Sequence, residues 1–301
     1  MKLSIEYSNK SLLNHKLDAI IVFIFEDSGL TGSGLISLPA ALKKNLNTSL
    51  KLKVFTGKKD NCQQLFSGYA NIPQILAVGV GKKSEMNSET LRRVAGKAGK
   101  MLSSLKAKNI GFAVTSNLQK TSKTDVGQVL VEGLTLGSYK FNQYKDSHDD
   151  ISKLESIKIQ CCDPENITSR KALKTGKMRA DGTNLARNLG NMPANDLRPR
   201  DLASAAKNIA KQHKIDCTVL EEKQMKKLGM DMLLGVSRGS RESAKLILME
   251  YFHQKAKQTV ALVGKGVTFD SGGISLKPGK NMDEMKFDMC GAAAVLGAMK
   301  I

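Results

Sequence analysis

The segment 263–294, VGKGVTFDSGGISLKPGKNMDEMKFDMCGAAA, carries most of the information on fold and function in this chain of 301 residues. It follows an apolar run, Val260–Val263, which predicts a buried strand that ends near Lys265. Paired glycines at 272 and 273 predict a tight loop, because glycine tolerates positive φ. A helix capped by Asn281 or Asp283 should follow. A strand, a Gly-rich loop and a helix in this order are typical of a segment that lines the active site of an α/β enzyme.

The charged side chains of this segment favour metal or electrostatic chemistry. Asp270 on the loop and Asp288 on the helix would supply oxygen ligands for divalent cations. Two roles are open to Lys265, as a protonated counter-ion or as a neutral amine bound to a metal. Lys277, if it stays protonated, would polarise a substrate carbonyl and stabilise an oxyanion. An ordinary cluster of Lys–Asp ion pairs beside a Gly-rich turn is the alternative, and the residues alone leave both interpretations open.

Composition limits the class of protein. No apolar run approaches the ~18 residues of a membrane span. The N-terminal MKLSIEYSNKS lacks the apolar region and cleavage site of a signal peptide, so we expect a cytoplasmic protein without membrane binding. The five cysteines are irregularly spaced and form no C-x-x-C pair, as expected of reduced thiols. The net charge of +19 indicates a lysine-rich solvated surface or a polyanionic partner.

Residues 1–165 alternate between strand and helix patterns, which is typical of an α/β domain with a parallel or mixed sheet. The pattern predicts strands at Ala19–Phe25, Lys51–Thr56, Gln74–Val80 and Asn109–Val114, and helices at Ser88–Leu105 and Asp125–Tyr139. A long helical pattern, Lys171–Leu189, follows and stops at Gly190 and Pro193. We expect this helix to join two domains.

The remaining residues predict a second unit. Helices are expected at Pro199–His213 and Glu222–Leu228, and strands at Asp216–Leu220, Leu246–Phe252 and Val260–Val263. The expected organisation is therefore an N-terminal α/β domain over 1–165, a linker helix over 166–195 and a second α/β domain over 196–301.

Several of these motifs match one family in order and spacing. They are Gly264–Gly266, Thr268–Gly273, Lys277-Pro278 and Asp283–Ala294. Together they resemble the signature of the leucyl aminopeptidases, or cytosol aminopeptidases, a family of dinuclear metallopeptidases. Residues 186–196 resemble the family's inter-domain helix and the start of its catalytic domain, and residues 237–251 are also similar. The resemblance is strong over residues 180–301 and architectural before them.

The resemblance implies a role for each site residue. Lys265, Asp270 and Asp288 would be metal ligands, with Asp270 bridging two divalent metal ions, manganese or zinc. Lys277 would be the catalytic lysine, and Met285 would line the pocket for the N-terminal side chain of the substrate. The implied fold is a macro-like N-terminal α/β domain, a linker helix and the first part of an α/β aminopeptidase catalytic domain.

The resemblance also implies an activity. A water held between the metals would release N-terminal residues, leucine above all, from peptides in a cytoplasmic homohexamer. In the complete enzyme a bicarbonate ion held by an arginine would act as the base. The family's second motif, an NTDAEGR-like run with two more carboxylate ligands, does not occur among these residues. We therefore expect a chain truncated at its C-terminus and inactive alone.

Two other classes of function stay open at this point. A DNA-binding accessory role, which some members of this family have, would suit the charge of +19. The salt dependence of DNA binding would separate it from loose attraction by lysines. A non-catalytic, macro-like ligand-binding module would need the N-terminal domain to bind a nucleotide on its own, and its loops show no recognisable phosphate signature. The Gly-rich stretches at 29–34, 79–83 and 264–266 fit neither the G-x-G-x-x-G nor the Walker A pattern.

Overall fold

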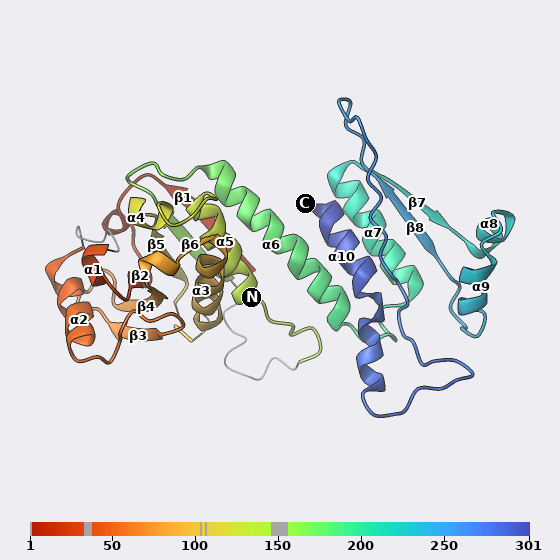
Figure 1. Ribbon diagram of the computed structural model, residues 1–301, viewed down its shortest axis with the longest axis horizontal. Coiled ribbons are helices and arrows are strands. Elements are labelled where there is room, and N and C mark those ends of the chain that lie inside the picture. Colours follow the sequence, from red (N-terminus) through yellow and green to blue (C-terminus); the bar gives the residue numbers. More distant parts are fainter. Residues whose placement is uncertain (1, 33–37, 103, 106, 146–155) are drawn as a thin grey trace. The chain divides into compact units, whose positions relative to one another are not determined.

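The computed structural model describes residues 2–32, 38–102, 104–105, 107–145 and 156–301 (Figure 1). It divides into two compact units, Met1–Ala180 and Asp181–Ile301. The division falls inside helix α6 (Arg170–Asn191), within the range that the sequence assigns to a linker helix. The two units are described separately.

The first unit is built on a six-stranded sheet with the strand order β1-β6-β5-β2-β4-β3. Strand β3 is antiparallel to β4, and the other neighbouring strands are parallel. The strands are β1 (Lys2–Ser8), β2 (Ala19–Phe25), β3 (Cys62–Phe66), β4 (Gln74–Gly81), β5 (Asn109–Ala113) and β6 (Ser156–Cys162). The helices are α1 (Gly29–Gly32), α2 (Ala40–Lys51), α3 (Ser88–Met101), α4 (Ser116–Gln119) and α5 (Val126–Gly137), with 3₁₀ helices η1 (Leu12–Asn14) and η2 (Lys83–Glu85).

Alternation along the central strand explains why this sheet has a core on each face. Every residue of β2 is buried. Ile21 and Phe23 belong to the core that also contains residues of α3 and α5. Ile20 and Val22 point to the opposite face and pack with α2. Because successive side chains of a strand face opposite sides, a continuous apolar run requires cover on both faces.

The second unit contains a two-stranded antiparallel sheet and several helices. Its elements are α7 (Pro199–His213), β7 (Asp216–Leu220), α8 (Glu222–Lys227), α9 (Asp231–Ser237), β8 (Leu246–Glu250), the 3₁₀ helix η4 (Met282–Met289) and α10 (Cys290–Lys300). Pro199 occupies the first turn of α7, where its missing N–H costs nothing. Asp201 accepts the Arg198 backbone N–H at 3.0 Å and closes that end of the helix. The core of this unit gathers side chains of α7, η4 and α10.

The structure confirms a mixed α/β fold and most of the predicted elements. The strands at Ala19–Phe25 and Asp216–Leu220 and the helix at Pro199–His213 have the predicted bounds. The other strands and helices expected around β4, α3, β5, α5, α6, α8 and β8 are present with ends displaced by a few residues. Within the described ranges, no helix is long and apolar enough to cross a membrane.

The strand predicted at Lys51–Thr56 is wrong. Lys51 is the last residue of α2, and Lys53 has a φ of +56°, which ends the helix in a left-handed turn. The alternation of apolar and polar residues over 51–56 does not reflect a half-buried strand. Phe55 is fully buried, whereas Leu52 and Val54 are exposed. The sequence analysis also misses α2 itself, together with strands β1, β3 and β6.

The strand predicted at Val260–Val263 is also wrong. Residues 251–263 form neither helix nor strand (Figure 1). Their side chains are exposed. The helix expected after Asn281 exists, but its first part is the 3₁₀ helix η4 rather than α-helix. Asn281 occupies the position before it with a φ of +62° and makes no side-chain cap there.

Candidate functional site

The predicted site residues all lie in the second unit, on three consecutive pieces of chain. Lys265 lies at the end of the extended segment, and its carbonyl oxygen accepts a hydrogen bond of 2.8 Å from the Ala292 N–H in the first turn of α10. Asp270 lies in the Gly-rich loop that follows. Asp288 lies near the end of η4, immediately before α10. Both residues are therefore positioned by the start of α10, Lys265 through this hydrogen bond and Asp288 through the chain itself.

The loop around Asp270 is closed by backbone hydrogen bonds. Asp270 Oδ1 accepts the Gly272 N–H at 2.9 Å, and the Ser271 carbonyl accepts the Lys277 N–H at 2.9 Å. Gly272 and Gly273 have φ values of +90° and +67°. Because these values suit glycine, the paired glycines let the chain fold back so that Lys277 returns to Asp270.

Two ion pairs bring the predicted residues together. Lys265 Nζ lies 2.8 Å from Asp288 Oδ2, and Lys277 Nζ lies 2.8 Å from Asp270 Oδ2. Lys277 Nζ also donates to Met285 Sδ at 3.0 Å. Side chains three residues apart on a 3₁₀ helix lie on one side of it, so Met285 and Asp288 face the same way.

The electrostatics join the two pairs into one cluster. The close approach of Asp288 raises the pKa of Lys265, and the negative charges of Asp288 and Asp270 act in the same direction. The hydrogen bond from Lys277 lowers the pKa of Asp270, with further contributions from the Gly272 N–H and from the charges of Lys277 and Lys265. Lys265 and Asp270 thus affect each other although neither is the other's closest partner.

The donor set determines what this cluster could bind. Asp288 Oδ2 is shielded from solvent and, within the part of the chain that the structure describes, receives no hydrogen bond of normal geometry. The Lys265 ammonium group at 2.8 Å neutralises it only as an ion pair. A shielded carboxylate oxygen of this kind is suited to a cation. No group of three or more His, Cys, Asp or Glu side chains gathers around a metal position in the described ranges. Carboxylate oxygens and a lysine amine are nevertheless groups that can bind a divalent cation.

Sequence reasoning misses the backbone contacts that shape this cluster. Ser271 and Ala292 act through a carbonyl and an N–H group, which every residue has, so no side-chain motif marks them. The contact between Lys277 and Met285 is also missed, because it depends on the 3₁₀ geometry of η4.

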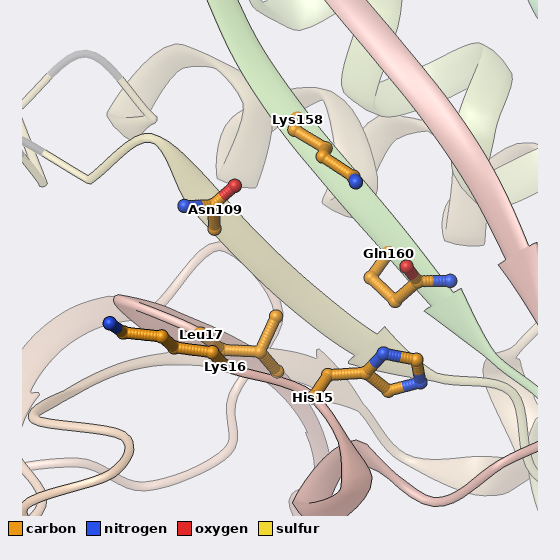
Figure 2. A pocket seen from close by; sticks show the side chains of 6 residues that line it. All are labelled: His15, Lys16, Leu17, Asn109, Lys158 and Gln160. Atoms are coloured by element: carbon orange, nitrogen blue, oxygen red, sulfur yellow. The ribbon is translucent and has the colours of Figure 1, made fainter.

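The first unit has a separate hollow of about 170 Å³ at the N-terminal ends of β2 and β5 (Figure 2). It is lined by His15, Lys16, Leu17, Asn109, Lys158 and Gln160. Lys158 is paired with Glu6 at 2.9 Å, and the His15 ring lies 3.0 Å from Ser8 Oγ. Ligand pockets usually measure about 300–1,000 Å³. The hollow is smaller than that, and two of its basic groups, Lys158 and His15, already have partners, so we assign it no ligand.

These features define a two-unit α/β protein whose second unit carries a lysine–aspartate cluster on a Gly-rich segment. Two family models match the chain. The catalytic domain of the cytosol aminopeptidase family matches residues 184–301, and the N-terminal domain of the same family matches residues 21–148. The chain belongs to the cytosol aminopeptidase family.

Curated relatives agree with this assignment. A probable cytosol aminopeptidase of Alkaliphilus oremlandii (strain OhILAs) is 38% identical over 290 residues, which are 94% of this chain and 58% of the relative. One of Geobacter sp. (strain M21) is 37% identical over 299 residues, which are 98% of this chain and 60% of the relative. The chain therefore spans about three fifths of the length of the curated relatives that it matches.

Solved structures share the fold. A mutant of tomato leucine aminopeptidase is similar with a TM-score of 0.80 and 27% identity, over 99% of this chain and 59% of that one. The bottromycin maturation enzyme BotP in complex with Mn is similar with a TM-score of 0.72 and 26% identity, over 94% of this chain and 55% of that one.

Proposed function

We propose that the protein containing this chain is a metal-dependent aminopeptidase that releases N-terminal residues, with a preference for leucine, from peptides. The observation that carries the proposal is the cluster itself, in which both lysines and both aspartates of the signature segment interact. Membership in the family supports the reaction, and the names of the relatives support peptides as substrates. The same matches favour this function over the DNA-binding alternative.

Asp270, Asp288 and Lys265 would hold two divalent metal ions, with Asp270 between them. Divalent cations bound there would polarise the peptide carbonyl and make a neighbouring water more acidic. Carboxylate ligands suit manganese and zinc alike, and the manganese complex of BotP supports manganese. Lys265 would bind as a neutral amine after giving its proton to solvent, which releases Asp288 from the ion pair.

Lys277 is the residue that we assign to the developing oxyanion. Its ammonium group donates to both Asp270 Oδ2 and Met285 Sδ, which fix its position. A donor fixed in advance stabilises the negative charge without reorganising during the reaction. Met285, which lies against Lys277, lines the pocket for the N-terminal side chain of the peptide.

The described residues supply two carboxylates and one amine, which are too few for two metal ions. The relatives are also longer than this chain. We therefore propose that the remaining ligands, and an arginine that holds a bicarbonate base, come from further residues of the protein that contains this chain. We also propose that this protein forms a homohexamer. The chain of 301 residues alone should still bind metal, but weakly and with fewer than two ions per chain, and it should turn over no peptide.

The test measures hydrolysis of leucine amide and metal content in the intact protein that contains these residues. Activity should disappear with chelator and return with manganese or zinc. Asp270→Ala and Asp288→Ala should lose metal and activity together, whereas Lys277→Ala should keep its metal and lose turnover by about 10²–10³-fold. Asp283→Ala, on the same 3₁₀ helix as Asp288, is the matched control and should resemble the parent. Hydrolysis that survives chelation contradicts the proposal, and loss of metal from Lys277→Ala would mean that the roles of ligand and electrophile are exchanged.

A further inference from the structure

The backbone around Lys265 lies directly on the first turn of α10. The Ala292 N–H donates to the Lys265 carbonyl at 2.8 Å. A methyl group at Gly264 would lie 2.5 Å from the carbonyl carbon of Gly291 and 2.6 Å from the Ala292 nitrogen. A methyl group at Gly291 would lie 2.8 Å from the Lys265 nitrogen. Side-chain carbons do not come this close to other atoms, so two glycines meet here because nothing larger fits.

Backbone conformation does not explain these two glycines. Neither Gly264 nor Gly291 has a φ in the left-handed region, unlike Gly272 and Gly273 of the neighbouring loop. An alanine could adopt their conformations without strain. The requirement at both positions is therefore space, which allows one backbone to approach the other.

This contact connects the two partners of one ion pair. Asp288 precedes Gly291 by three residues at the junction of η4 and α10, and Lys265 follows Gly264 directly. The relative position of the two backbones thus sets where the Lys265 amine meets Asp288 Oδ2, now at 2.8 Å. Metal sites tolerate ligand displacements of only about 0.2 Å in bond length.

We infer that Gly264 and Gly291 are positioning residues that hold Lys265 and Asp288 in register for binding a divalent cation. The inference rests on the proposed role of these two residues as metal ligands. A methyl group at Gly291 has to push the Lys265 backbone away by several tenths of an ångström to reach ordinary contact distance. The hydrogen bond from Ala292 then lengthens, and the Lys265 amine leaves its place beside Asp288.

The chain offers a control on the same helix. A methyl group at Gly297 would lie 2.6 Å from the Gly182 carbonyl oxygen, so it is as crowded as one at Gly291. Gly297 lies six residues further along α10, about 9 Å away from Gly291. Gly297→Ala therefore reproduces the overlap and the loss of stability, but not the displacement of Lys265. Gly235→Ala, in α9, has no atom within 4 Å of the new methyl group and controls for the substitution itself.

The experiment titrates each variant of the full chain with manganese(II) and with zinc(II) alone, by calorimetry, and measures its Tm separately. Gly291→Ala and Gly264→Ala should weaken the metal Kd about 10–100-fold, as loss of an outer support of a ligand does. Gly297→Ala should lower the Tm and leave the Kd unchanged, and Gly235→Ala should change neither. An unchanged Kd in Gly291→Ala, or an equal loss in Gly297→Ala, overturns the inference.

A measurement on the unmodified chain covers the case in which a glycine variant does not fold. Zinc(II) should slow hydrogen exchange at the Ala292 amide, because the ion fixes Lys265 and with it the acceptor of that N–H. Exchange at Ala292 that is indifferent to bound zinc contradicts the inference. Absence of any metal binding by the unmodified chain would instead contradict the proposed function, so the two failures are distinguishable.

Discussion

Met289 anchors the element that carries Asp288, and its replacement by alanine should destabilise the second unit. The side chain is fully buried, one residue beyond Asp288 at the end of η4. It belongs to the core that also contains Leu202 and Ile209 of α7 and Leu296 of α10. Met289→Ala therefore removes the apolar contact that holds the junction of η4 and α10 against α7.

The magnitude follows from the buried volume. Alanine lacks the thioether and two carbons of methionine, which contribute about 2.4 kcal/mol at about 0.8 kcal/mol per buried group. A cavity of roughly 60 Å³, at about 24 cal/mol per Å³, adds about 1.4 kcal/mol if the site does not collapse. The sum of about 4 kcal/mol lies within the usual range for this substitution in a core. For a unit of this size, about 4 °C per kcal/mol predicts a loss of about 15 °C in Tm.

Differential scanning calorimetry of Met289→Ala measures this loss. Phe112→Ala, in the core of the first unit, identifies which transition belongs to that unit. Met289→Leu preserves volume and should cost less than about 1.5 kcal/mol. A Tm within about 4 °C of the parent for Met289→Ala, or equal losses for alanine and leucine, would refute the assignment of Met289 as the anchor.

Two further predictions concern ionisation in the first unit. The Arg93 hydrogen bond lowers the pKa of Glu89, so this pair stabilises the fold above the ordinary glutamate pKa of about 4.3 and loses its effect as the pH falls below it. The difference in urea midpoint between the parent and Glu89→Gln should therefore shrink on acidification, and a difference that grows would contradict the sign. Burial raises the pKa of Cys161 and raises that of Cys162 to about 12, which leaves a thiolate fraction on the order of 10⁻⁴ at pH 8. A thiol reagent should modify at most three of the five cysteines in the native chain, and rapid modification of Cys162 would show that the strand β6 opens.

Local sequence patterns predicted the elements that carry a clear signal of their own, either continuous burial or a marked helix start. Ala19–Phe25 is apolar throughout because both faces of the central strand are covered, and Pro199–His213 has a clear start at Pro199 and Asp201. Strand β6 has no such signal, because its place between β1 and β5 depends on partners about 50 and 150 residues away in the chain. Its polar residues on one face, Lys158 and Gln160, hide the apolar alternation of the other face.

The candidate site could be predicted as a set of side chains but not as an arrangement. The residue types of Asp270, Lys277 and Asp288 predicted metal or electrostatic chemistry. The glycines at 272 and 273 predicted the tight loop. The pairing of each lysine with a particular aspartate could not be predicted, since it depends on where η4 and the loop lie in space. Whether these residues bind metal stays a prediction.

The apolar run Val260–Val263 shows why the position of Lys265 needed the structure. The run has the composition of a strand, yet Val260, Leu262 and Val263 are 79%, 56% and 94% exposed. An apolar run predicts the capacity to form a strand, whereas the strand itself exists only where a neighbour satisfies its N–H and C=O groups. In the described residues, this run has no such neighbour, and Lys265 is held instead by the Ala292 N–H and by the contact of Gly264 with Gly291. The close contact of the two glycines therefore positions Lys265, a role that the sequence analysis assigned to hydrogen bonds of a strand. The metal titrations of the two alanine variants test whether this contact has that role.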